Sequence, residues 1–509
     1  MSFDFHSRRS MVVARRGMVA TSNPLASQAG LEILRRGGNA ADACVAAAAV
    51  LNVTEFSSTG VGGDMFALYF DAKTKQVTAL NGSGRAPAAL TVQFLRDQGY
   101  DEIPLLSPHS ITVPGAVAGW ADLLERHGTM MLADVLDDAI HYARDGYPVS
   151  PLYSGIWKRI EPILWNGVNS GEYLPGGSAP QVGQIVRLPG MAATLQAIAE
   201  GGAAAFYTGK IAEAIVQTIQ QQGGVMTLDD LKNHTSSWET PISSEYRGVR
   251  VYECPPNGQG IAALQALNIA AGFDLAALPA DSPERLHLMV EAMRLAFADA
   301  RYYVADLATD PAPVDWLLSA AYAAERRALI KRDAAMKPPS YGMPSAGSDT
   351  IYLSVVDGEG NACSFINSLY THPGSGIAAQ GQGFFLQSRG ALFTLEEGHP
   401  NVLAPNKRPY HTIIPAMATQ DGELWSSFGV MGGFMQPQGH LQMIVAMIDD
   451  ELNPQEALNR PRWCLESGSG DSALALEDGI PVSTMARLAE LGHRVRPVSG
   501  AGRGLFGDG

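Results

Sequence analysis

The spacing of apolar residues divides this chain into a mainly helical first two thirds and a β-rich last third. Two alternating stretches, 65–71 and 76–81, predict strands early in the chain, and strand-like character returns at 242–252. In the rest of this part of the chain, apolar residues recur every three to four positions, which indicates amphipathic helices. The predicted helices span 24–36, 39–51, 115–127, 132–146, 191–200, 210–222 and 283–304.

The pattern changes at the segment KPPSYGMPSAGS, residues 337–348, which is rich in Pro, Gly and Ser and predicts an exposed linker. Strands dominate beyond it, with two helices near 439–449 and 485–491. A chain that begins with helices and strands and ends in a hairpin-built sheet predicts a layered α+β sandwich. The predicted late strands span 350–357, 361–368, 384–388, 412–419 and 423–430.

Composition excludes several classes of function. The 509 residues are 46% hydrophobic and 17% charged, which is enough for a large core in one large unit or a few domains. The net charge of -15 disfavours nucleic acid and anionic membranes as partners. The four cysteines form no CxxC pair, and no apolar run has the length of a signal peptide or membrane span. We therefore expect core thiols and a cytoplasmic protein.

Thr350 is the first candidate for catalysis because it follows the linker and opens the alternating strand TIYLSVVD. Cleavage between Asp349 and Thr350 would leave a hydroxyl and a free α-amine on one residue. An α-amine titrates at roughly 7.7 to 8.0, so it can accept the hydroxyl proton at neutral pH. The alternative is that Thr350 has no catalytic role and only starts a strand, where threonine is common.

Two further features fit the same chemistry. The adjacent Gly432 and Gly433 can present two backbone N–H groups to an oxyanion, although a tight turn would also explain them. Ser368 ends the second hairpin strand, where its hydroxyl can orient the first residue of the partner strand, although a plain strand serine would fit as well. No HExxH, P-loop or dinucleotide motif is present, so we expect neither a metal nor an organic cofactor.

Several ordered motifs resemble the γ-glutamyltransferase family over essentially the whole chain. They are GLEILRRGGNAADACVAAAAVLNV at 30–53, TIYLSVVDGEGNA at 350–362, GSGI at 374–377, PNKRP at 405–409 and the glycine pair at 432–433. The resemblance implies a four-layer αββα sandwich of the N-terminal-nucleophile hydrolase type. It also implies a precursor that cuts itself into segments 1–349 and 350–509, which interlock in one unit. Catalysis would use Thr350, an oxyanion hole of the Gly432 and Gly433 amides, and Ser368 as the second hydroxyl.

The residues that hold a glutamyl group in the transferases differ here. Ser83 stands at the position of their carboxylate-binding arginine, and Leu392 at that of the amine-binding aspartate. Without that aspartate, a substrate amine would have no counter-charge. Arg85 and Arg389 can still fork a carboxylate, although structural ion pairs are an equally good explanation of each. Tyr370, His411 and Thr412 would complete the walls of the substrate pocket.

The resemblance is strongest to an amidohydrolase branch that includes oxamate amidohydrolase. We therefore predict an amidohydrolase that cleaves a small carboxylate-bearing amide such as oxamate to oxalate and ammonia. A γ-glutamyl hydrolase or transferase, a cephalosporin-acylase-like enzyme and an uncut binding scaffold are the alternatives. The expected partners are the amide and the chain's own two fragments, and a homo-oligomer stays open. Family members continue past the Gly-rich AGRGLFGDG end, so we expect a shortened C-terminus.

Overall fold

A computed structural model describes residues 9–337, 351–467, 472–507 and 509. Most of the predicted linker, and with it the predicted cleavage site Asp349–Thr350, lies outside the described residues.

The first layer of strands is an antiparallel six-stranded sheet in the order β1-β9-β10-β2-β3-β6. Strands that follow the linker lie in its middle, because β9 and β10 stand between β1 and β2. Parts of the chain on both sides of the linker thus share one hydrogen-bonded sheet. The strands are β1 (Gly17–Thr21), β2 (Asp64–Asp71), β3 (Gln76–Gly82), β6 (Ser237–Glu239), β9 (Ile351–Asp357) and β10 (Ala362–Ser368).

A second, four-stranded antiparallel sheet has the order β12-β11-β8-β7 and packs on the face of the first. Side chains join the two sheets: Ser354 Oγ of β9 donates to Ser427 Oγ of β12 over 2.7 Å. Its strands are β7 (Ile242–Tyr246), β8 (Val249–Glu253), β11 (Ala416–Gln420) and β12 (Glu423–Phe428).

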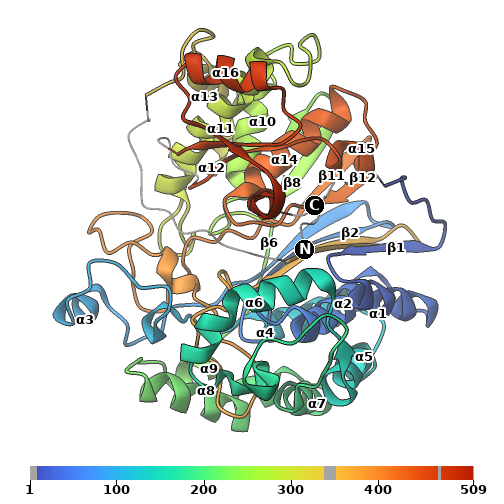
Figure 1. The fold of residues 1–509 in the computed structure, drawn as a ribbon, viewed down its shortest axis with the longest axis vertical. Coiled ribbons are helices and arrows are strands. Elements are labelled where there is room, and N and C mark those ends of the chain that lie inside the picture. Colours follow the sequence, from blue (N-terminus) through green and yellow to red (C-terminus); the bar gives the residue numbers. More distant parts are fainter. Residues whose placement is uncertain (1–8, 338–350, 468–471, 508) are drawn as a thin grey trace.

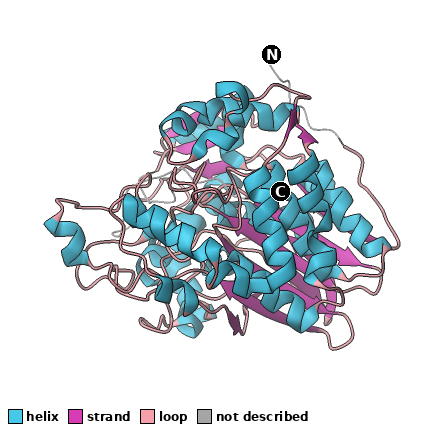
Figure 2. Cartoon of the chain, turned by 90° about the horizontal axis from the view of Figure 1, so that it is seen from below, coloured by secondary structure: helices cyan, strands magenta, loops and turns pink. Residues whose placement is uncertain are grey.

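Helices cover the outer face of each sheet and complete four layers (Figure 1). In Figure 2 the helices of one layer lie beside the strands that they cover. The layer on the six-stranded sheet contains α1 (Pro24–Arg35), α2 (Ala40–Thr54), α4 (Ala116–His127), α5 (Leu132–Asp145), α6 (Pro151–Asn166), α7 (Pro189–Tyr207) and α8 (Lys210–Gln221). The layer on the four-stranded sheet contains α10 (Gly260–Ala270), α11 (Pro283–Tyr303), α13 (Ala320–Arg327), α14 (Met435–Ile448) and α16 (Val482–Glu490).

The alanine-rich helix α2 shows how sequence produces this layering. All of its residues are buried, because α2 packs against β9 and β10 on one side and against α1 and α5 on the others. Small alanines let these elements approach closely. Asn39 and Asp42 form a capping box that satisfies the first backbone N–H groups of the helix. The predicted α+β, αββα architecture is confirmed.

Shorter elements connect and flank the layers. None of the described helices is long and apolar enough to cross a bilayer. These elements are α3 (Val92–Asp97), α9 (Leu228–Lys232), α12 (Val314–Leu317), α15 (Pro454–Leu458), β4 (Tyr147–Pro148), β5 (Ile185–Val186), β13 (Trp463–Leu465), β14 (Leu474–Glu477) and β15 (Val495–Val498).

The predicted strand at 384–388 is wrong, since its ladder contact is one isolated bridge between Ala378 and Phe385. Its backbone bonds instead to irregular segments: Gln387 N donates to Gly62 O over 3.0 Å. The stretch 242–252 forms two strands, β7 and β8, which turn at Arg247 and Gly248.

Candidate active site

The site begins where β10 ends. Ser368 is its last residue and is fully buried, and its Oγ accepts a hydrogen bond from the Tyr370 backbone N–H over 2.9 Å. Tyr370 has a φ of 81°, an unusual value for a residue with a side chain. Such backbone strain often marks functional sites, and here it turns the chain sharply after the strand.

Arg389 joins this turn to a distant loop. It starts the short helix η4 (Arg389–Leu392) and is 0% exposed. One guanidinium nitrogen donates to Ser368 Oγ over 3.1 Å, and another donates to Thr412 Oγ1 over 2.7 Å. Its carbon lies 4.6 Å from the centre of the Tyr370 ring. Four residues named from sequence therefore lie in direct contact.

Gln259 extends the contacts to the glycine pair. Its side-chain nitrogen donates to Thr412 O over 2.7 Å and to Gly433 O over 2.9 Å. Its side-chain oxygen accepts from the Tyr410 hydroxyl over 2.9 Å, so this buried amide has partners at both ends. The fixed amide holds the Thr412 loop against the turn that contains Gly433.

Gly432 and Gly433 lie between β12 and α14 with φ values of 105° and 56°. A φ above 100° is strained for any residue with a Cβ, which explains a glycine at 432. Neither N–H donates a hydrogen bond to any residue that the structure describes. Two adjacent backbone donors thus stand without acceptors next to the contacts of Gln259.

Asp64, the first residue of β2, supports the site from behind and is fully buried. Its carboxylate accepts four hydrogen bonds, so both of its buried oxygens have donors. It thereby fixes the segments around Gly84 and Gly115 relative to the Thr412 loop. The donors are Gly84 N at 2.9 Å, Gly115 N at 3.2 Å, Gln387 Nε2 at 2.9 Å and His411 Nε2 at 3.1 Å.

His411 is a neutral imidazole in this arrangement. Its Nδ1 accepts from the Ile413 N–H over 3.3 Å, so the ring proton is on Nε2 and donates to Asp64. Burial first and the nearby Arg389 charge second lower its pKa to about 3, against the opposing effect of Asp64. His411 therefore orients and packs, with its ring 4.7 Å from that of Phe66.

The charge of Arg389 has no ion-pair partner among the described residues. Its Nε makes no hydrogen bond there, and burial lowers its pKa to about 10, although Asp64 and Tyr370 favour the charged form. A buried guanidinium without a paired carboxylate is costly. The site thus presents spare cationic donors.

Arg85 is not in contact with this group. It is half-buried, and its guanidinium donates to Thr235 O over 3.2 Å. Its charge acts on Arg408, whose pKa is lowered to about 10 by burial first and by Arg85 second. Of the two arginines predicted to bind a carboxylate, Arg389 contacts Ser368 and Arg85 contacts Thr235.

The segment after η4 packs down onto the molecule. Phe393, Leu395 and Leu403 form a small core with Leu90 and Leu95 of the α3 region. A surface hollow of ≈ 660 Å³ beside this segment is lined by residues 99–102 and 393–396 and by Arg96, and it contains none of the predicted site residues.

Asp64, Gln259 and Gln387 are missing from the prediction. Signals for the first two exist in hindsight: Asp64 ends the glycine-rich STGVGGD, and Gln259 lies in the turn PPNGQG. Glycine-rich turns bring backbone close to a site, so a polar residue in one is a candidate. Nothing in its local sequence distinguishes Gln387.

Two facing sheets between helical layers are the fold of the N-terminal-nucleophile hydrolases. The chain belongs to the gamma-glutamyltranspeptidase family, whose sequence model matches residues 26–505. It resembles the crystal structure of cephalosporin acylase from Bacillus halodurans, with a TM-score of 0.93, 43% identity and coverage of 99% of this chain and 93% of that one.

Two curated relatives extend the comparison. The glutathione hydrolase-like YwrD proenzyme of Bacillus subtilis is 39% identical, covering 96% of this chain and 92% of the relative. The oxamate amidohydrolase proenzyme of Klebsiella pneumoniae is 34% identical, covering 95% and 92%. Their names support amide hydrolysis as the class of reaction and self-processing as a feature of the family.

Proposed function

We propose that this chain is a self-processing N-terminal threonine amidohydrolase that cleaves a small amide bearing a carboxylate, with oxamate as the smallest example. The observation that carries the proposal is the buried Arg389, which contacts Ser368 and Thr412 and has no ion-pair partner among the described residues. This cation suits a substrate carboxylate, and it lies at the end of β10.

The position of β9 supports Thr350 as the nucleophile. Ile351, the first residue of β9, pairs with Asn367, the residue before Ser368. The start of β9 therefore lies at the end of β10 where Arg389 makes its contacts. Thr350 directly precedes Ile351 in the sequence, so a cut before Thr350 would free its α-amine at this end of the sheet.

The reaction then proceeds in two balanced steps. Thr350 Oγ attacks the amide carbon while its proton passes to the α-amine, and the Gly432 and Gly433 N–H groups bind the oxyanion. The amide nitrogen takes that proton and leaves as ammonia, which yields an acyl ester of Thr350. Water adds to the ester carbon, and the acid leaves while the threonine hydroxyl is restored.

Thr350→Ala tests the proposal directly. We expect an uncut chain by intact mass and no ammonia release from oxamate, whereas Thr350→Ser keeps a hydroxyl and should retain cleavage and part of the activity. A wild-type chain that stays whole and still hydrolyses oxamate would overturn the assignment of the nucleophile.

A longer acyl group is the second candidate, because a cephalosporin acylase has 43% identity to this chain. An acyl chain that ends in a carboxylate would also use Arg389 and would need no amine-binding acid. Leu392 at the transferases' aspartate position argues against a γ-glutamyl group. Rates of ammonia release from the half-amides of oxalic, malonic, succinic and glutaric acids would identify the accepted length. Release of aniline from γ-glutamyl anilide should be slower than any of them.

A further inference from the structure

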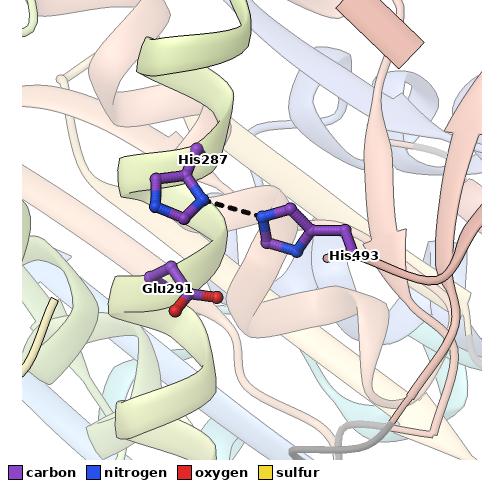
Figure 3. A group of neighbouring side chains, drawn as sticks. All are labelled: His287, Glu291 and His493. Atoms are coloured by element: carbon purple, nitrogen blue, oxygen red, sulfur yellow. Dashed lines mark hydrogen bonds between the residues drawn. The ribbon is translucent and has the colours of Figure 1, made fainter. Parts of the chain in front are cut away.

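A second buried polar group lies far from the site just described, in the outer layer on the four-stranded sheet. Three side chains converge there: His287 and Glu291 from α11, and His493 from the turn between α16 and β15 (Figure 3). All three are buried, and one ligand atom from each lies within 4.8 Å of the others. The i, i+4 spacing places His287 and Glu291 on one face of the helix.

The hydrogen bonds fix which atoms carry lone pairs. His287 Nε2 lies 2.6 Å from Lys331 O, and a carbonyl oxygen accepts only, so the ring proton of His287 is on Nε2. Its Nδ1 therefore accepts the Nε2–H of His493 over 2.8 Å, and His493 Nδ1 has no hydrogen-bond partner among the described residues. For His493 Nε2 to bind an ion, its proton moves to Nδ1 of the same ring. A histidine that donates its other N–H to a backbone carbonyl has the arrangement usual for metal ligands.

Glu291 contributes acceptor capacity in the same place. Its Oε2 accepts from the Met336 N–H over 2.7 Å, and its Oε1 accepts no hydrogen bond from the described residues. Its side chain is 0% exposed, so bulk water cannot donate a hydrogen bond to Oε1. Two imidazole nitrogens and one carboxylate thus face a common point, where an ion would replace the hydrogen bond between the two rings.

We propose that His287, Glu291 and His493 bind one divalent transition-metal ion of the zinc type. Two histidines and a carboxylate are a donor set that zinc accepts, with water as the fourth ligand. Two nitrogens bound to one zinc stand about 3.3 Å apart, so the imidazoles need to separate by about half an ångström. This ion would join α11 to the C-terminal segment, and under the proposed cleavage it would join the two fragments.

The charge of Arg294 weakens the binding of a metal ion at this site. It is one turn beyond Glu291, with its Nε 3.3 Å from Glu291 Oε1, and its positive charge opposes a cation at this point. Removing that charge should strengthen binding. Arg294→Gln is therefore expected to bind zinc at least tenfold more tightly than the wild type.

The test uses the full chain after treatment with a chelator and dialysis. Titration with Zn²⁺ should give one site per chain, and Co²⁺ should give the visible absorption of a four- or five-coordinate ion. His287→Ala, His493→Ala and Glu291→Gln should each weaken Zn²⁺ binding at least tenfold. In the wild type, Zn²⁺ should raise the melting temperature by several degrees, and in His493→Ala it should not.

His141→Ala is the matched control, because His141 lies 2.9 Å from Asp145 on the exposed face of α5 and could bind Zn²⁺ at the surface. This variant should bind like the wild type. Absence of a site in both the wild type and Arg294→Gln would overturn the proposal. So would unchanged affinity in folded His287→Ala and Glu291→Gln proteins, with circular dichroism as the check of folding.

Discussion

The buried polar group around Ser368 and the one around Glu291 offer opposite kinds of hydrogen-bonding atom. Around Ser368, the described residues supply donors: the Arg389 guanidinium has an unused Nε–H, and Gly432 and Gly433 have unused backbone N–H groups. Around Glu291, they supply acceptors: a carboxylate oxygen of Glu291 and the Nδ1 of His493, each without a hydrogen bond.

This difference indicates the charge of the ligand at each place. Buried polar atoms are nearly always satisfied, so a surplus of donors favours an anion and a surplus of acceptors favours a cation. The candidate active site therefore suits an oxyanion and a carboxylate, and the second group suits a metal ion. Changes that reverse either surplus test the comparison.

The largest effect is expected from removing the cation of the donor-rich site. Arg389→Gln should lower kcat/KM for oxamate by about 1,000-fold, or about 4 kcal/mol, because a buried carboxylate would lose its charged partner. Steady-state ammonia release measures it. Hydrolysis of a neutral amide such as propionamide should fall much less, because it has no carboxylate to bind.

Arg85→Gln is the matched control for this change. Arg85 is half-buried and bonded to Thr235 O, outside the contacts of Arg389. Its kcat/KM should stay within about twofold of the wild type, as for most surface substitutions. Equal losses in both variants would mean that the carboxylate is bound elsewhere.

The next largest effect is expected from changing Asp64, the buried carboxylate that accepts hydrogen bonds behind the candidate active site. Asp64→Asn replaces one oxygen by an NH₂ group, which then faces N–H donors such as those of Gln387 or His411. We expect a loss of about 3 kcal/mol in the free energy of unfolding, since buried donors lose their acceptor. Denaturant unfolding gives the value. A variant as stable as the wild type would show that these four hydrogen bonds contribute little.

The smallest effect is the pH dependence that His411 contributes. Its pKa is about 3 in the folded protein and 6.5 as the ordinary value, so the unfolded chain binds a proton that the folded chain does not between these pH values. The contribution is complete above pH 6.5 and is lost as the pH falls toward 3. At pH 5 the loss is about 2 kcal/mol.

Thermal melts of the wild type and His411→Gln at pH 7 and pH 5 measure this effect. The glutamine cannot titrate, so its melting temperature should fall less between the two pH values. The exposed His141→Gln should behave like the wild type, and identical slopes in all three proteins would contradict the shift of His411.

Local pattern predicted most of the fold, and its failures have local causes. The helix α6 was missed because Pro162 lies inside it. The helix α10 was missed because its apolar residues surround the helix, so no amphipathic period is visible. The stretch 384–388 is typical of a strand because it is apolar, yet its residues are buried by packing on other elements. Phe384 packs on Phe206 of α7, and Phe385 packs on Phe56.

The site was predicted only in part, for a different reason. Ser368, Tyr370, Arg389 and Thr412 were named from sequence and lie in contact. Asp64 and Gln259 were not, because their role depends on partners more than 150 positions away, as in the bonds of Asp64 to His411 and of Gln259 to Thr412. Pairing over such separations follows from the topology of the sheets, which periodicity does not report.

The position of β9 and β10 between β1 and β2 affects how the protein can refold after the proposed cut. Once the proposed cut has been made, the two pieces stay together because neither has a complete sheet without the other. After denaturation, however, the two fragments must associate again, so refolding becomes a second-order process that slows on dilution. An uncut precursor folds at a rate independent of its concentration. The cut therefore makes unfolding harder to reverse at low protein concentration.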